Sequence, residues 1–116
     1  MFADDYQQMF GKTLSVTQGK ATPGDFILSL SADKKLGEEG YEIKITDRIT
    51  TSAPTLTGLY WSTRTLLQIA EQSQEHSFPK GIIRDYPDYS IRGFMIDCGR
   101  KFIPMSYLQD LVKIMA

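Results

Sequence analysis

The spacing of apolar residues changes period in the middle of the chain, and this change most constrains the fold. Apolar and polar residues alternate over residues 41–46, which is typical of a strand with one buried face. After a short turn, residues 49–52 predict a second strand. Over residues 56–70 the apolar positions recur every three or four residues, as on one face of a long helix, with Thr55 or Thr57 as its N-cap. The expected core is a sheet covered by a helix.

Shorter patterns flank this core. Apolar residues at helical spacing over residues 2–10 predict a short helix that Gly11 can end. Residues 26–30 predict a strand, the charged residues 33–40 a loop, and residues 82–84 another short strand. The order helix, strands, helix predicts a two-layer α+β unit with both helices against one sheet.

The C-terminal region carries a new pattern. Residues 91–98 are a second apolar run that predicts a buried strand, and Pro104 fits the first turn of a following helix. The helical pattern is still running at Ala116. Because one strand and one helix cannot close a core, we expect the last ~30 residues to begin a larger unit, a βα unit being about that long, and the chain to be a fragment.

Composition excludes several classes of function. The 116 residues suffice for one domain of ordinary size, and 13 basic against 14 acidic residues leave no positive excess for nucleic acid. One cysteine and one histidine cannot form an intramolecular disulfide or a structural zinc site. No phosphate-binding glycine motif, secretion signal or apolar run of about 20 residues is present. We therefore predict no metal, no cofactor and no membrane partner.

The isolated acidic and basic candidates favour structural roles. Asp85 and Asp88 lie in a turn, where local hydrogen bonds are a more common role for Asp than catalysis. The pairs Asp4-Asp5 and Glu38-Glu39 are most simply solvated charges. His76, at a polar helix end, can act as a base, but a cation that complements the helix dipole is the more ordinary role.

The remaining candidates are aromatic or sulfur-containing. Tyr60 and Trp61 can stack on a sugar ring, but their helical spacing favours packing in the core. Cys98 lies in the apolar run without a nearby histidine, which favours a buried, inert thiol over a nucleophile.

Asp97 and Arg100 are the strongest candidate site. They stand at the C-terminal end of the predicted strand 91–98, ahead of a helix, and in a parallel α/β barrel this is the catalytic face. The guanidinium of Arg100 can donate two parallel hydrogen bonds to hydroxyls or a carboxylate. An Asp97–Arg100 ion pair that only pins the loop explains the spacing equally well.

Four segments together resemble one enzyme family. Residues 92–104 (RGFMIDCGRKFIP) resemble the first barrel strand of family 20 glycoside hydrolases, the β-N-acetylhexosaminidases. Residues 39–41 (EGY) and residues 58–68, which end in TLLQ, resemble segments of that family's small N-terminal domain. Residues 83–87 (IRDYP) resemble its linker into the barrel. The likeness runs in the family's order from about residue 25 to the end of the chain.

The resemblance implies a fold in two parts. Residues 1–85 correspond to a small, non-catalytic, two-layer α+β domain that packs against a (β/α)8 barrel. Residues 86–116 correspond to the first strand and helix of that barrel, here truncated. The fold class expected from the resemblance is therefore α+β, followed by the beginning of a TIM barrel.

The resemblance also implies residue roles. Arg100 matches the Arg that binds hydroxyls of the terminal sugar in the deepest subsite, and Asp97 matches a position that supports it. Arg92 matches the start of the strand, away from the active face, and is expected to be structural. Lys101 stands where the family usually has His, which puts the neighbouring hydrogen bonds in question.

The family's reaction is retaining hydrolysis of terminal N-acetylhexosamine residues, in which the substrate's own acetamido oxygen attacks the anomeric carbon. An adjacent Asp-Glu pair on a later strand supplies the acid and orients the acetamido group. No Asp-Glu dipeptide occurs in residues 1–116. We therefore assign no catalytic residue to this chain and expect the chain alone to be inactive.

A second hypothesis is a free-standing, non-catalytic module that binds a glycan or another protein. On the first hypothesis the partners are N-acetylhexosamine-containing glycans, bound through the complete barrel. A barrel strand without neighbours also exposes an edge through which copies of the chain can associate. Linkage preference, gluco or galacto selectivity and cell location do not follow from the sequence, although the family is compatible with an exported or cell-surface parent.

Overall fold

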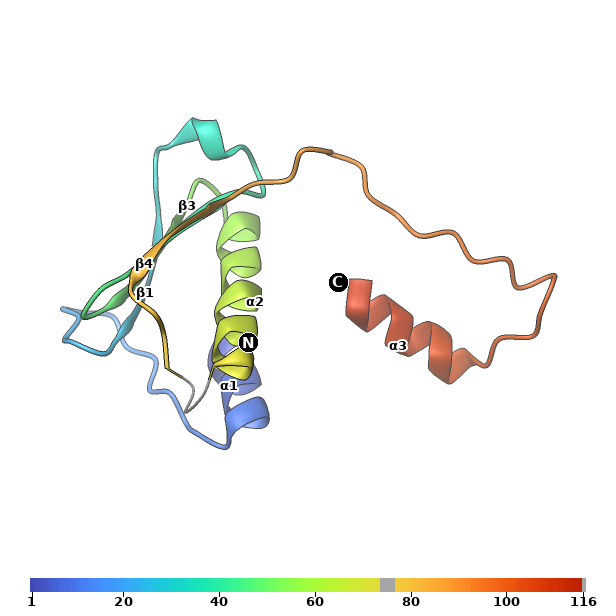
Figure 1. Cartoon of the computed structure of the whole chain (residues 1–116), viewed down its shortest axis with the longest axis horizontal. Helices are drawn as coiled ribbons and strands as arrows, with labels where there is room; N and C mark the ends of the chain where they lie inside the picture. Colours follow the sequence, from blue (N-terminus) through green and yellow to red (C-terminus); the bar gives the residue numbers. More distant parts are fainter. Residues whose placement is uncertain (74–76, 116) are drawn as a thin grey trace.

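The computed structural model describes residues 1–73 and 77–115, in which a small sheet and two helices form one body (Figure 1). The elements in chain order are α1 (Phe2–Phe10), β1 (Phe26–Leu30), the 3₁₀ turn η1 (Lys34–Leu36), β2 (Tyr41–Ile45), β3 (Ile49–Ala53), α2 (Leu56–Gln72), β4 (Gly81–Asp85) and α3 (Met105–Met115). The predicted helices and the first four predicted strands are confirmed within a few residues at their ends.

The sheet has the strand order β1-β3-β2-β4. Strands β2 and β3 form a hairpin around Asp47, with Ile45 opposite Ile49. Strand β4 pairs antiparallel with β2, whereas β1 pairs parallel with β3. The two edges of the sheet are therefore β1 and β4, and the chain leaves the sheet from the edge strand β4.

The core lies between the sheet and helix α2. Alternation in β2 and β3 turns Ile43, Ile45, Ile49 and Ala53 toward the helix, where all four are buried against Leu66. The opposite face of β2 carries Glu42 and Lys44, which form an ion pair, and Lys44 is exposed. The apolar face of the strands and the apolar face of α2 thus pack together in one layer, as the alternating and helical patterns predict.

Helix α1 closes the lower end of this layer. Tyr6, its buried residue, packs against Leu67 and Ala70 of α2. The rings of Phe2 and Tyr6 also meet Phe26 at the start of β1, with centroids 5.3 and 5.9 Å apart. Both helices therefore lie on one face of the sheet, in the two-layer α+β arrangement expected from the sequence (Figure 1).

The predicted loop 33–40 is more ordered than its charge suggests. Its 3₁₀ turn is capped by Asp33, whose side chain accepts a hydrogen bond from the backbone N–H of Lys35 at 3.1 Å. Leu36 at the end of the turn is 3% exposed. A single apolar residue therefore fastens this loop to the core.

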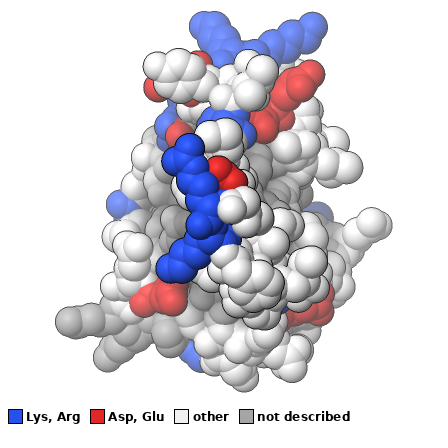
Figure 2. All heavy atoms as spheres, turned by 90° about the vertical axis from the view of Figure 1, so that its right-hand side faces the viewer, with Lys and Arg blue, Asp and Glu red and all other residues white. Residues whose placement is uncertain are grey.

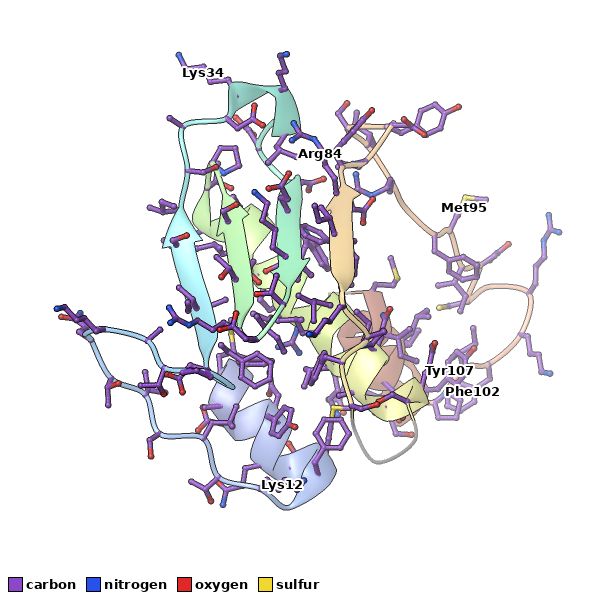
Figure 3. All side chains as sticks on the ribbon, turned by 60° about the vertical axis from the view of Figure 1, so that its left-hand side comes forward. Lys12, Lys34, Arg84, Met95, Phe102 and Tyr107 are labelled. Carbon is purple, nitrogen blue, oxygen red and sulfur yellow. The ribbon has the colours of Figure 1, made fainter. Side chains whose placement is uncertain are left out.

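The prediction of a strand over residues 91–98 was wrong for this chain. Residues 91–97 follow an extended path away from the sheet without pairing, and the large apolar side chains of Ile91, Phe94 and Met95 are exposed (Figures 1 and 3). A strand exists through hydrogen bonds to a neighbour, and no neighbouring strand is available within the described residues. Cys98 is consequently exposed, not buried as expected.

The predicted C-terminal helix is present as α3, but it buries none of its residues. Apolar side chains such as Val112 and Ile114 are 65% and 82% exposed. The helix therefore has an apolar surface without a packing partner in the described part of the chain.

Candidate functional site

The turn after residue 97 brings the two predicted site residues together. Arg100 Nε lies 3.1 Å from Asp97 Oδ2, and the other carboxylate oxygen of Asp97 accepts the backbone N–H of Gly99 at 2.8 Å. Asp97 thus shapes its own turn and orients Arg100. The Asp97–Arg100 ion pair, one of the two interpretations that the spacing allowed, is therefore present in the structure.

Arg100 nevertheless keeps most of its hydrogen-bonding capacity. Its side chain is 90% exposed, and its terminal nitrogens Nη1 and Nη2 have no partner within residues 1–73 and 77–115. On the face of the molecule that the C-terminal segment covers, basic and acidic groups are interspersed among uncharged side chains (Figure 2). The fork of Arg100 is therefore open to a polar ligand, whereas the ion pair itself is well solvated and weak.

A second polar cluster joins β2, α2 and the end of β4. The hydroxyl of Tyr41, a 4% exposed residue, donates to Asp85 Oδ2 at 2.8 Å. Since the single hydroxyl proton of Tyr41 goes to the carboxylate, the hydroxyl of Thr65 donates to Tyr41 Oη across 2.6 Å. Burial raises the pKa of Tyr41 to about 12, with a further contribution from the neighbouring Asp85 carboxylate.

Glu39 and Gly40, directly before Tyr41, also contact the chain that follows β4. Glu39 Oε2 accepts a hydrogen bond from Arg92 Nη2 at 2.7 Å. Gly40 is buried so closely that a Cβ there would lie 2.1 Å from the carbonyl oxygen of Leu36 and 2.9 Å from Tyr86 Cβ. Only glycine fits this position without a shift of the backbone.

The side chain of Arg84, the residue before Asp85, lies on the opposite face of β4. It donates from Nη2 to Asp33 at 2.7 Å and from Nη1 to Glu42 at 3.3 Å. The Arg84 guanidinium and the backbone N–H of Lys35 hold the pKa of Asp33 below its usual value. Alternation along β4 therefore sends Arg84 to the solvent face and Asp85 to the helix side.

An open cleft of about 530 Å³ lies between helix α2 and the C-terminal segment. Tyr60, Trp61 and Arg64 line its α2 side, and Lys113 and Ile114 of α3 line the other. The Arg64 guanidinium lies 4.9 Å from the centre of the Tyr60 ring and binds Asp5 at 2.5 Å. The cleft is therefore aromatic and basic on the α2 side.

The two adjacent aromatic residues of α2, Tyr60 and Trp61, have different surroundings. Trp61 is partly buried against the main core, as its helical spacing predicts. Its Nε1–H is buried without a hydrogen-bond acceptor among the described residues, while its ring edge meets Tyr60 at a centroid distance of 5.2 Å. Tyr60 itself lines the cleft.

The structure changes the interpretation of three other candidates. Asp85 binds Tyr41, a residue distant in the sequence, so local turn bonds do not explain it. Glu39 and Asp5, taken as solvated charges, form ion pairs with Arg92 and Arg64. His76 lies outside the described residues. Arg92 is structural, as expected, since its two terminal nitrogens bind Glu39 and the carbonyl oxygen of Tyr89.

Sequence reasoning missed the polar partners Tyr41 and Thr65. Tyr41 stands at a position that the alternating pattern assigns to core packing, Thr65 lies outside the apolar positions of the helical pattern, and neither type of residue marks a site on its own. One signal was present: an aspartate at the end of a strand can accept a hydrogen bond from a hydroxyl on an adjacent element.

The described residues offer neither a metal site nor a membrane-spanning helix. They contain no group of three or more His, Cys, Asp or Glu side chains placed to hold a metal ion. Within the same ranges, every helix is too short or too polar to cross a membrane.

The sequence profile of "Glycosyl hydrolase family 20, domain 2" matches residues 1–86. The match spans the sheet, both of its helices and the polar cluster around Tyr41. The chain belongs to glycosyl hydrolase family 20. The β-hexosaminidase of Akkermansia muciniphila is 39% identical over 61 residues, which cover 51% of this chain and 12% of that protein. The β-hexosaminidase of Porphyromonas gingivalis is 27% identical over 126 aligned residues, covering 100% of the chain and 16% of that protein.

Solved structures of family 20 members have the same fold. A GH20 β-N-acetylhexosaminidase from Streptomyces coelicolor superposes with a TM-score of 0.71 and 25% identity over 97% of this chain and 25% of its own. A further β-N-acetylhexosaminidase superposes with a TM-score of 0.61 and 26% identity over 84% of this chain and 22% of its own. The family 20 chain thus spans a quarter or less of the length of these relatives.

Proposed function

We propose that this family 20 chain is the N-terminal part of a β-N-acetylhexosaminidase that removes terminal N-acetylhexosamine residues from glycans. On this proposal residues 1–85 are its small, non-catalytic domain, and residues 86–116 form the first strand and helix of its catalytic (β/α)8 barrel when the rest of the barrel is present. The domain 2 match over residues 1–86, followed directly by the Asp97–Arg100 turn, carries the proposal. The relatives named β-hexosaminidase support the substrate class.

Arg100 is the residue we assign to the sugar. Its exposed guanidinium group suits two neighbouring hydroxyls, and the ion pair between Asp97 and Nε limits the orientations of the Arg100 side chain. Asp97 is therefore a positioning residue and Arg100 a substrate-binding residue. The exposed apolar residues of 91–97 and α3 support the barrel assignment, because strand and helix surfaces of this kind are covered inside a barrel.

The reaction needs groups beyond residues 1–116. Substrate-assisted hydrolysis requires a general acid and a carboxylate that orients the acetamido group, and the Asp-Glu pair for these roles is absent from the sequence. What the chain supplies is one ligand to the sugar. We therefore expect residues 1–116 alone to lack glycosidase activity.

The test combines sequence and activity. The coding DNA beyond codon 116 should continue in frame for ~250 residues, the usual barrel length, and encode an Asp-Glu pair. In that longer protein Arg100→Ala should reduce kcat/KM for a chromogenic N-acetylglucosaminide, with Lys101→Ala as the neighbouring control. Turnover by the purified chain 1–116 that survives both washing and Arg100→Ala would contradict the proposal.

The cleft beside α2 favours one alternative, a non-catalytic glycan-binding module. Tyr60 and Trp61 present aromatic rings at an open cleft, on which the face of a sugar ring can stack. Trp61 is the only tryptophan, so its fluorescence reports directly on this site. Saturable quenching by N-acetylglucosamine that Tyr60→Ala abolishes would favour the module, whereas an unchanged spectrum would favour the enzyme fragment.

A further inference from the structure

Three consecutive residues before and within β2 each contact the chain that leaves the sheet. Glu39 binds Arg92, Gly40 packs on Tyr86, and Tyr41 binds Asp85. The two segments thus run alongside each other over the whole exit from β4.

The three contacts restrict different parts of the exit. Tyr41 and Asp85 are paired in the β2–β4 ladder, so their hydroxyl–carboxylate bond fixes the last residue of the sheet. The missing side chain of Gly40 lets Tyr86 lie directly on the backbone of the preceding loop. Further along the chain, Glu39 forms an ion pair with Arg92. Between Tyr86 and Arg92, the ring of Pro87 restricts the backbone dihedral angle φ.

We propose that Glu39, Gly40 and Tyr41 form an exit clamp that sets the direction in which the C-terminal segment leaves the small domain. The clamp positions the Asp97–Arg100 turn relative to helix α2. These residues are positioning residues: they act on the path of residues 85–92 and touch neither Asp97 nor Arg100. The clamp acts on the path of this chain alone, whether or not a barrel or a glycan is present.

The clamp has a buried part and an exposed part. The Tyr41 hydroxyl is backed by Thr65 and belongs to a 4% exposed residue of the core, although its partner Asp85 is exposed. In the Glu39–Arg92 ion pair the side chain of Glu39 is 29% exposed and that of Arg92 is 47% exposed. The pair therefore restricts the path of the exit segment but contributes little to the free energy of unfolding. Loss of the Glu39–Arg92 ion pair should therefore widen the range of paths that residues 85–92 adopt without unfolding the domain.

The sequence contains a natural pair of probes for this test. Trp61 on α2 is the only tryptophan, and Cys98, beside the Asp97–Arg100 turn, is the only cysteine and is exposed. An energy-transfer acceptor attached to the Cys98 thiol therefore reports its distance distribution from Trp61. Time-resolved donor decay separates a shift of the mean distance from a broadening.

The variants Glu39→Gln and Tyr41→Phe should broaden this distribution, and the double variant should broaden it further. Glu38→Gln makes the same charge change one residue earlier, on a side chain without an ion pair in the described part of the chain. Tyr6→Phe makes the same change on a buried tyrosine of α1. Both controls should leave the distribution unchanged.

Exchange of the charges provides a rescue that a general loss of stability cannot imitate. The E39R/R92E protein should recover the narrow distribution that E39R alone loses. Far-UV circular dichroism and thermal unfolding confirm that each protein is folded. A folded Glu39→Gln or Tyr41→Phe protein with the distribution of the parent chain, or a charge exchange without rescue, would overturn the proposal.

Discussion

At the scale of single residues, Gly58 at the start of α2 packs closely against Gly40. A Cβ on Gly58 of α2 would lie 2.3 Å from the carbonyl oxygen of Gly40 and 2.9 Å from Ala53 Cβ. Helix propensity alone predicts that Gly58→Ala stabilises the protein by about 1 kcal/mol. We expect the opposite sign, a loss of about 1–3 kcal/mol in the free energy of unfolding, because the helix has to move off the sheet.

Urea unfolding of Gly58→Ala tests this expectation. Gly81→Ala is the matched control, since a Cβ there meets no atom within 4 Å. Its free energy of unfolding should stay within about 1 kcal/mol of the parent value. A Gly58→Ala protein more stable than the parent would show that α2 does not need this contact.

Tyr41 predicts a dependence of stability on alkaline pH. Its pKa is raised to about 12 from an ordinary value of 10.0, so the folded state holds the phenol proton more tightly than the unfolded state. The resulting stabilisation is fully present below pH 10 and is lost as the pH rises toward 12. Tyr41→Phe also loses the bonds to Thr65 and Asp85, at a cost of about 1–2 kcal/mol near neutral pH.

The measurement is the difference in unfolding free energy between the parent and Tyr41→Phe proteins at several pH values. This difference should be constant from pH 7 to 9 and should shrink above pH 10. A difference that grows above pH 10 would mean that the ionised phenolate, not the phenol, is favoured in the fold.

At the scale of elements, the start of α2 depends on one threonine. Thr55 Oγ1 accepts the backbone N–H of Gly58 at 3.1 Å, and its hydroxyl donates to the carbonyl oxygen of Glu38. Thr57, the other N-cap candidate from the sequence, lies exposed in the first turn. Thr55→Ala should therefore cost about 1–2 kcal/mol, and Thr57→Ala should change stability by less than about 0.5 kcal/mol. Thermal unfolding of both variants decides between the caps, and equal losses would contradict the assignment.

The elements themselves were largely predictable because their signals are local. Alternation over residues 41–46 and the three-and-four spacing over residues 56–70 are confirmed by β2 and α2. The prediction of a strand over residues 91–98 was wrong although it rested on the same kind of signal. An apolar run indicates that a segment can be buried, but it does not indicate whether a neighbouring strand is present. Its signal was real, but its hydrogen-bond partners are not among the described residues.

At the scale of the whole molecule, stability is concentrated in the part before residue 86. Strand β2 lies in the centre of the sheet with three buried side chains, whereas α3 buries none and is only 11 residues long. An isolated helix of that length is marginal in water. Amide hydrogen exchange of the dilute chain should therefore be fast over 92–115 and slow over 41–45.

Equal protection of the two regions would show that something covers α3, either a second copy of the chain or another part of this one. Sedimentation of the same sample at several concentrations separates these cases. A monomer with a protected α3 would contradict the packing described here.

The sequence by itself determined the period of the elements before residue 86, the apolar face of α2 and the family resemblance, because each depends on residues close together in the chain, and it limited the N-cap of α2 to Thr55 or Thr57. It also placed Asp97 and Arg100 on one turn, since they are three residues apart. Only the tertiary structure decided the strand order, with β1 parallel to β3, and the partners of Asp85 and Glu39. The partners of Asp85 and Glu39 lie more than 40 positions away in the chain, and the paired residues of β1 and β3 lie 23 positions apart. The free energy of these contacts depends on burial and on which neighbours the fold brings within hydrogen-bond distance.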